Sequence, residues 1–209
     1  MPNVSSVKSK YFGVSAATDR NGICAAQTTG AAGSLTLDGA GVTNSVATFG
    51  TNAVATITIY AASSNTGVNF EITGTDVTGA AQVVTIAGPG AGATVTTTEN
   101  FLTVTEVAVD AAITGDAEVG WTRIATDVGC IFAGRTRIRG IQGLSGTTAG
   151  DVSFNNTSIT GTTLLTIPTS TTADLIEPYI PDNAVLFDAG AYISYANGVL
   201  AGITVFYDG

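Results

Sequence analysis

Short runs of hydrophobic residues separated by single polar residues recur along the chain from residue 22 onward. Ile57 and Ile59, for example, alternate with Thr56, Thr58 and Tyr60. Because successive side chains of a β-strand point to opposite faces of a sheet, this alternation is typical of strands with one buried face. It predicts strands around residues 34–38, 56–60, 69–73, 84–86, 102–109, 119–123, 130–132, 135–139, 152–154, 164–167, 185–187, 192–195 and 203–207.

The segments between these runs carry turn residues, such as Gly88-Pro89-Gly90 and Asn197-Gly198. No stretch longer than ten residues has clear helical spacing, and only residues 174–177 suggest a helical turn, which Pro178 would end. The alternation changes parity between Val104 and Val107, which predicts a β-bulge there. Short strands joined by Gly-rich turns without crossover helices predict an all-β fold of antiparallel β-sandwich domains, Ig-like or jelly-roll-like.

The distribution of charge divides the chain of 209 residues into two acidic halves. Residues 21–122 contain eight acids and no Lys or Arg, and residues 140–209 contain six acids and again no base. We therefore expect an N-terminal arm at residues 1–21, followed by two β-sandwich domains at residues 22–126 and 127–209. The arm is polar, carries three bases and has no convincing periodicity, so we expect it to become ordered only on binding.

Three of the seven basic residues lie in one short segment between the halves, Gly134 to Gly140. On a strand, Arg135, Arg137 and Arg139 would project from one face, and the residues between them from the other. Three like charges in a row repel one another unless nearby acidic side chains neutralise them. They could pair with acids of the first half, face water, or meet acids of a partner. We expect the row to lie at an interface between domains or subunits, with at least two of the three arginines paired to carboxylates. The predicted partner-binding residues are Arg135, Arg137, Arg139, Lys8, Lys10 and Arg20.

The residue types exclude several kinds of chemistry. The chain has no histidine, which removes the Ser-His-Asp and Cys-His arrangements and the commonest zinc ligand. The Gly-rich segment at residues 88–92 lacks the Lys-Ser/Thr ending of a phosphate-binding loop. We therefore expect a protein that is not an enzyme, with no catalytic residues, no cofactor and no metal site. Cys24 and Cys130 are expected to be buried, reduced thiols.

The composition also limits the kinds of partner. A net charge of −9 argues against nucleic acid and anionic membranes as partners. No apolar run approaches the roughly 20 residues of a membrane span, and the first residues lack the apolar core of a signal peptide. We therefore expect other protein subunits as partners.

Six short segments together carry a resemblance to a known family, and they lie at residues 35–39, 70–79, 88–90, 95–104, 187–193 and 202–207. They resemble the small all-β virion structural proteins of tailed bacteriophages. The resemblance implies a structural protein assembled on the virion in many copies, in the host cytoplasm. It does not identify the place on the particle, since head decoration, neck, tail and fibre-associated proteins share such β modules.

The leading expectation is a head decoration, or cement, protein that bridges and stabilises subunits of the major capsid protein as a homotrimer. The alternatives are a neck, tail or fibre-associated virion protein and, from another class, an adhesive or carbohydrate-binding module. A carbohydrate-binding module usually exposes an aromatic platform. The residues that could form one are Trp121, Tyr179, Tyr192 and Tyr195.

Overall fold

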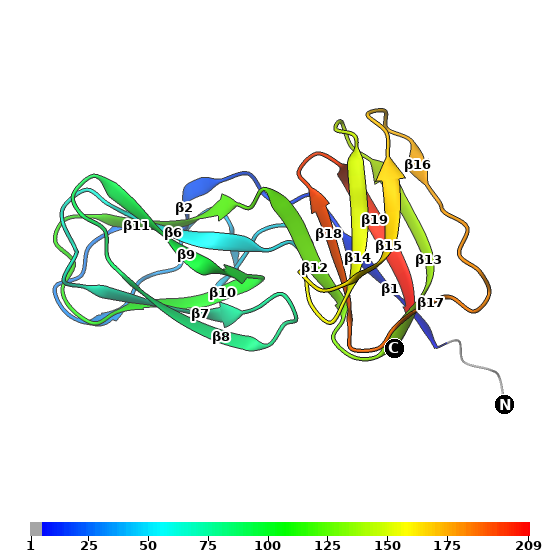
Figure 1. The fold of residues 1–209 in the computed structure, drawn as a ribbon. Coiled ribbons are helices and arrows are strands. Elements are labelled where there is room, and N and C mark those ends of the chain that lie inside the picture. Colours follow the sequence, from blue (N-terminus) through cyan, green and yellow to red (C-terminus); the bar gives the residue numbers. More distant parts are fainter. Residues whose placement is uncertain (1–5) are drawn as a thin grey trace. The chain divides into compact units, whose positions relative to one another are not determined.

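The computed structural model describes residues 6–209, which form an all-β protein built from antiparallel sheets (Figure 1). This confirms the predicted fold class at the level of all-β with antiparallel pairing. Within the described range no residue is helical, so no helix there is available to cross a membrane. The chain divides into two compact units. The N-terminal unit comprises Ser15–Gly50 and Val54–Ile124, and the C-terminal unit comprises residues 6–14, Thr51–Ala53 and Ala125–Gly209.

The N-terminal unit contains two sheets. One has the strand order β2-β11-β6-β9, and the other has the order β4-β5-β10-β7-β8, with β3 also paired to β10. Its strands are β2 (Asp19–Gln27), β3 (Gly33–Ser34), β4 (Val42–Thr43), β5 (Val46–Thr48), β6 (Ala55–Ala61), β7 (Asn69–Thr75), β8 (Ala81–Ala87), β9 (Ala93–Phe101), β10 (Thr103–Val109) and β11 (Ala117–Arg123).

The two sheets of the N-terminal unit enclose one hydrophobic core. Ile57 and Ile59 of β6 and Phe70 and Ile72 of β7 are completely buried in it, although they come from different sheets. Trp121 of β11 packs against another core ring at 5.3 Å between centroids, and its indole Nε1 donates a hydrogen bond to a backbone oxygen at 2.9 Å. Burial of alternate side chains from two facing sheets makes this unit sandwich-like.

The C-terminal unit also contains two sheets. One has the order β1-β19-β13-β16, with β17 paired to β13, and the other has the order β12-β18-β14-β15. The strands are β1 (Val7–Phe12), β12 (Thr126–Phe132), β13 (Thr136–Ser145), β14 (Gly150–Asn156), β15 (Thr163–Thr169), β16 (Leu175–Ile176), β17 (Val185–Phe187), β18 (Ala191–Ala196) and β19 (Leu200–Asp208).

The core of the C-terminal unit again receives side chains from both of its sheets. Ile138 and Val205 come from the first sheet, and Phe154 and Ile193 come from the second. Phe12 of β1 is 2% exposed, so β1 contributes to this core although it lies more than 110 residues before β12. The core shared by two facing sheets makes this unit sandwich-like too.

Most strands predicted from alternation are present, and the predicted bulge is confirmed, because the register of β10 and β7 shifts between Val104 and Glu106. Two local predictions were wrong. Residues 35–37 are not a strand, although Leu35 is buried and its backbone N–H bonds to the oxygen of Val107. Residues 174–177 form no helical turn, because Leu175 and Ile176 pair with β13 as β16.

The expected N-terminal arm differs most from the structure. Residues 1–5 lie outside the described residues, but Val7–Phe12 pair with β19 along their whole length, and β2 begins at Asp19. Residues 6–14 therefore belong to the C-terminal unit and residues 15–21 to the N-terminal unit. Backbone pairing to β19 and burial of Phe12 hold β1 in place, which the polar composition of this segment did not indicate.

Candidate docking surface

Four of the predicted partner-binding residues lie at one end of the five-stranded sheet of the C-terminal unit. Lys8 on β1 is opposite Tyr207 on β19, and Tyr207 is in turn opposite Ile138 on β13. Arg137 and Arg139 flank Ile138 in the sequence, and Arg135 comes just before β13. We call Lys8, Arg135, Arg137 and Arg139 the basic end of this sheet.

The alternation along the start of β13 places the arginines away from the core. Thr136 and Ile138 are buried, at 3% and 0% exposure, whereas Arg137 is half-buried and Arg139 is exposed. The register between β13 and β19 shifts between Ile138 and Gly140, so Arg139 lies at an irregularity of the ladder. At a bulge of this kind, one residue of the strand is left without a cross-strand partner, and its side chain can point in a different direction.

Arg139 forms a bidentate ion pair with Asp208 of β19. Its Nε lies 2.9 Å from each carboxylate oxygen, and its Nη2 lies 2.7 Å from Oδ2. Hydrogen bonds from Arg139 lower the pKa of Asp208, and the same bonds raise the pKa of the guanidinium. Thr136 donates to the backbone oxygen of Asp208, so both ends of this acid are attached to β13. The pair closes the β13–β19 ladder at its last residues.

Nearby carboxylates balance the charges of the other two arginines of the basic end less completely. Arg135 lies 3.5 Å from Asp188, but both side chains are about 70% exposed, and such pairs contribute only about 0–1 kcal/mol. Arg137 donates from Nη1 to the backbone oxygen of Asn183 at 2.6 Å, and within residues 6–209 no carboxylate lies within 4 Å of it. Two of the three arginines therefore pair with carboxylates, as expected, but with acids of their own unit. A hollow of about 240 Å³ lies beside Arg135 and Arg137.

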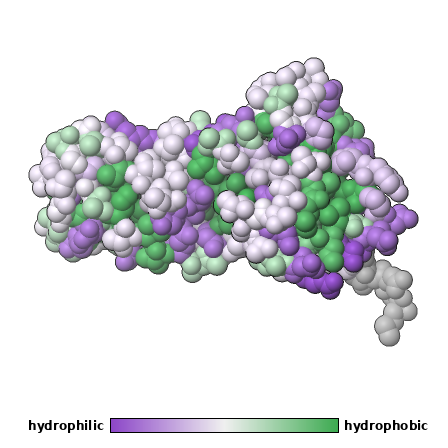
Figure 2. All heavy atoms as spheres, viewed as in Figure 1, coloured by the Kyte–Doolittle hydropathy of each residue, from purple (hydrophilic) through white to green (hydrophobic). Residues whose placement is uncertain are grey.

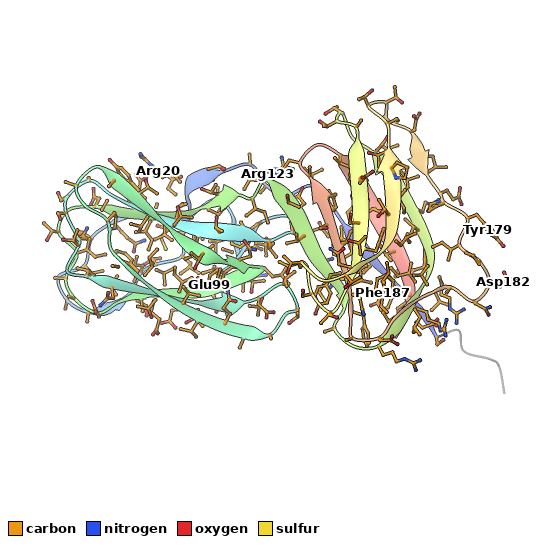
Figure 3. The ribbon with its side chains drawn as sticks, in the orientation of Figure 1. Arg20, Glu99, Arg123, Tyr179, Asp182 and Phe187 are labelled. Atoms are coloured by element: carbon orange, nitrogen blue, oxygen red, sulfur yellow. The ribbon has the colours of Figure 1, made fainter. Side chains whose placement is uncertain are left out.

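The two remaining predicted residues have structural contacts. Lys10 of β1 is half-buried and donates from Nζ to the backbone oxygen of Cys130 at 2.7 Å, and burial lowers its pKa. Arg20 belongs to the N-terminal unit, where it pairs with Glu118 and stacks 4.2 Å from the centroid of the Tyr60 ring (Figure 3). The structure therefore does not bring these two residues into the basic end.

An apolar groove on the same sheet was missed by sequence reasoning. Tyr11, Leu144 and Leu175 line it and are 46%, 42% and 64% exposed. The cross-strand rows that form it run from Gly202 through Leu144 to Leu175, and from Tyr11 to β19 and β13. Gly202 makes the groove possible, because a Cβ atom there would lie 2.3 Å from the Tyr11 hydroxyl. The volume of the groove is about 330 Å³.

The aromatic residues considered for a carbohydrate platform are mostly in the cores. Trp121, Tyr192 and Tyr195 are only 4–7% exposed, whereas Tyr179 is 85% exposed and lies with Asp182 on a loop that projects from the C-terminal unit (Figure 3). Hydrophobic residues also reach the surface on the face of this unit that carries β15 (Figure 2).

Both cysteines are buried and reduced, as expected. Burial, together with the nearby charge of Asp38, raises the pKa of Cys24 to about 12. At neutral pH this thiol is protonated and packs as a small hydrophobic side chain in the N-terminal core.

Comparison of the chain with protein-family models, with curated proteins and with solved structures found no match.

Proposed function

We propose that this chain is a non-enzymatic structural protein that binds other protein subunits through the five-stranded sheet of its C-terminal unit. The observation that carries this proposal is the combination, on one sheet, of an exposed apolar groove with an arginine that has no carboxylate within 4 Å among residues 6–209. The groove is lined by Tyr11, Leu144 and Leu175, and the arginine is Arg137. Protein interfaces are enriched in Tyr and Arg, with an apolar centre and a polar rim.

The chemistry of the surface indicates what the partner offers. An apolar side chain would fill the groove, and a carboxylate would pair with Arg137 and with the more exposed Arg135. Loss of water from a charged pair at a closed interface makes it matter more than the exposed pairs of the free protein. The partner surface is therefore partly apolar and partly acidic.

The resemblance to virion proteins of tailed phages supports a more specific proposal. The protein is a head decoration protein, built from two β-sandwich domains of the Ig-like or jelly-roll-like type, that bridges and stabilises subunits of the major capsid protein. The all-β fold and the interface-like surface of the C-terminal sheet are in keeping with this role. A neck, tail or fibre-associated protein is the alternative within the particle.

The ratio of this protein to the major capsid protein in purified particles distinguishes these places. A copy number comparable to that of the capsid protein supports decoration of the head, and a number sufficient for a single ring supports a neck or tail protein. Absence from purified particles would refute the virion proposal altogether.

The docking surface is tested by binding of the purified protein to particles that lack it. Arg137→Ala and Leu144→Ser should each weaken binding about tenfold, because each removes one half of the proposed interface. Arg20→Ala is the matched control, since Arg20 lies in the other unit and pairs with its own Glu118. Wild-type binding by both surface variants would refute the docking surface.

An adhesive role rests on one exposed aromatic residue. Tyr179 is 85% exposed, and the other aromatic residues considered for this role are buried. Binding to a glycan array that Tyr179→Ala abolishes would favour this function over the structural one.

A further inference from the structure

Strand β8 is an open sheet edge without any of the protective features that the other edges have. Edge strands expose unpaired backbone groups, and proteins protect them with charges, prolines, bulges or very short length. β8 is seven residues long, pairs with β7 without a register shift, and contains no charged residue and no proline. In residues 6–209 no strand pairs with its other side, and it forms the rim of its sheet in Figure 1.

The other edges each carry at least one of these features. β1 has Lys8 and Lys10, β15 has Pro168, and β9 has Glu99. β2 and β12 contain charged residues and register shifts, and β3, β4, β16 and β17 are only two or three residues long. The difference singles out β8 as an edge whose pairing is tolerated.

The side chains of β8 are consistent with pairing. Val84 and Ile86 face the core of the N-terminal unit, opposite Ile72 and Phe70 of β7. The intervening residues face outward and are exposed, and Val83 at the centre of the strand is 58% exposed. A new strand would extend the sheet beside β9 of the other sheet, to which β8 is already linked by a hydrogen bond from Gln82 Nε2 to the backbone oxygen of Asn100 at 3.1 Å.

We propose that β8 pairs antiparallel with β8 of a second copy of this chain, about a two-fold axis near Val84. On the outward face of this register Ala81 is opposite Ala87 and Val83 is opposite Thr85, and on the other face Val84 meets Val84 and Gln82 meets Ile86. A strand from an unrelated protein would need a matching pattern, whereas a second copy supplies it. The contact is isologous, as in most soluble dimers.

Charge also favours this edge for contact between copies. Two chains of net charge −9 repel each other, so they can approach most easily where neither carries charge on the pairing strand. Glu71 on β7 lies beside Thr85, but in the paired sheet the two Glu71 side chains are separated by the width of three strand spacings, about 14 Å. This proposal does not depend on the assignment to a virion.

The test measures the mass of the wild-type protein and of two matched double variants by sedimentation equilibrium over a range of concentrations. Val83→Lys with Thr85→Lys places lysines opposite each other twice in the proposed dimer, at positions that are exposed in the single chain. Leu164→Lys with Thr166→Lys makes the same chemical change at two exposed positions of the edge strand β15. The β8 variant should weaken dimerisation at least about tenfold, and the β15 variant should not change it.

Hydrogen exchange of the wild-type protein provides a readout that does not require a variant to fold. The β8 amides should become more protected as the concentration rises, while those of β15 should not. A wild type that stays monomeric, a dimer lost in the β15 variant, or a trimer that persists in the β8 variant would each overturn the proposal. Protection of β8 only after addition of another protein would likewise assign the edge to a different partner.

Discussion

The N-terminal unit carries nine carboxylates and two arginines, whereas the C-terminal unit carries seven carboxylates, three arginines and two lysines. The extra bases lie on β1 and at the start of β13, where they pair with acids of the same unit or line the basic end. The N-terminal unit instead has a neutral open edge at β8. Two units that each contain two antiparallel sheets thus present different surfaces, one with exposed arginines and an apolar groove and one with an uncharged sheet edge.

The difference has a physical origin in how each unit treats its edges. Lys8 and Lys10 on β1 disfavour pairing of a further strand beyond it, and the docking surface proposed for the C-terminal unit therefore lies on the face of its sheet. β8 has alternating uncharged residues, so its backbone is accessible. The positions of the charges thus distinguish a sheet whose face we propose for binding from a sheet whose edge we propose for binding.

The largest expected effect separates the two cores. Phe70→Ala and Phe154→Ala each remove a completely buried ring, which should lower the free energy of unfolding by about 3–5 kcal/mol. Hydrogen exchange should show loss of protection mainly in the unit that carries the change, because each core is built from strands of its own unit. Leu164→Ala is the control, since Leu164 is exposed. Equal loss of protection in both units would show that they unfold together.

A pair of glycines compares close packing in the two units. A Cβ at Gly120 would lie 1.9 Å from the backbone oxygen of Asp19, and one at Gly202 would meet only the end of the Tyr11 side chain. Gly120→Ala should therefore cost about 1–3 kcal/mol by forcing β11 and β2 apart. Gly202→Ala should change the melting temperature much less, because Tyr11 can rotate away from the groove.

Thermal melts monitored by circular dichroism measure both glycine effects. An equal loss of stability would mean that Tyr11 is held as firmly as backbone. If Gly202→Ala leaves stability intact but weakens particle binding, the position of the Tyr11 ring over the groove matters for docking.

Acid should destabilise both units, through different carboxylates. Hydrogen bonds from Asn69 lower the pKa of Asp110 in the N-terminal unit, and hydrogen bonds from Arg139 lower that of Asp208 in the C-terminal unit. A carboxyl whose pKa is lower in the folded state stabilises the fold above its unfolded pKa of about 3.9, and this contribution is lost as pH falls through the folded pKa.

One substitution in each unit separates the two contributions to the pH dependence of stability. Asp110→Asn should flatten the loss of stability below about pH 4 in the N-terminal unit, and Arg139→Ala should do so in the C-terminal unit. Chemical denaturation at a series of pH values, followed by hydrogen exchange of β10 and β19, measures them. An unchanged pH dependence in both variants would show that other carboxylates dominate acid unfolding.

The sequence predicted the parts of the fold that depend on local pattern. The bulge of β10 follows from the parity change between Val104 and Val107, and the burial of Ile138 follows from alternation through the arginine segment. β1 was missed because its residues Val7 and Tyr11 stay exposed and only Phe12 enters the core. Its formation depends on pairing with β19, which lies about 190 residues away in the sequence and leaves no local signal.

The docking surface was predictable to a similar extent. The row of arginines could be found in the sequence, but the acids that pair with it could not. Asp188 and Asp208 lie near the arginines because of the register of β13 with β17 and β19. The sequence left acids of the first half, water and acids of a partner open as the surroundings of the row. The groove could not be anticipated, because it combines a residue of β1 with glycines and leucines of strands far along the chain.

The smallest expected effect is on the rate at which Cys24 is chemically labelled. This rate reports local opening of the N-terminal core. Burial raises the pKa of Cys24 to about 12, so at pH 8 this residue has far less reactive thiolate than an exposed cysteine. Iodoacetamide should therefore modify Cys24 in the native protein only when the core opens, and should modify both cysteines after denaturation without a reductant.

Phe70→Ala should accelerate labelling of Cys24, because Phe70 lies in the same core, and Phe154→Ala should leave it unchanged. Mass spectrometry of the labelled peptides over time follows both cysteines separately. Rapid labelling of Cys24 in the native wild type would contradict its burial, and equal acceleration by the two substitutions would contradict separate opening of the two cores.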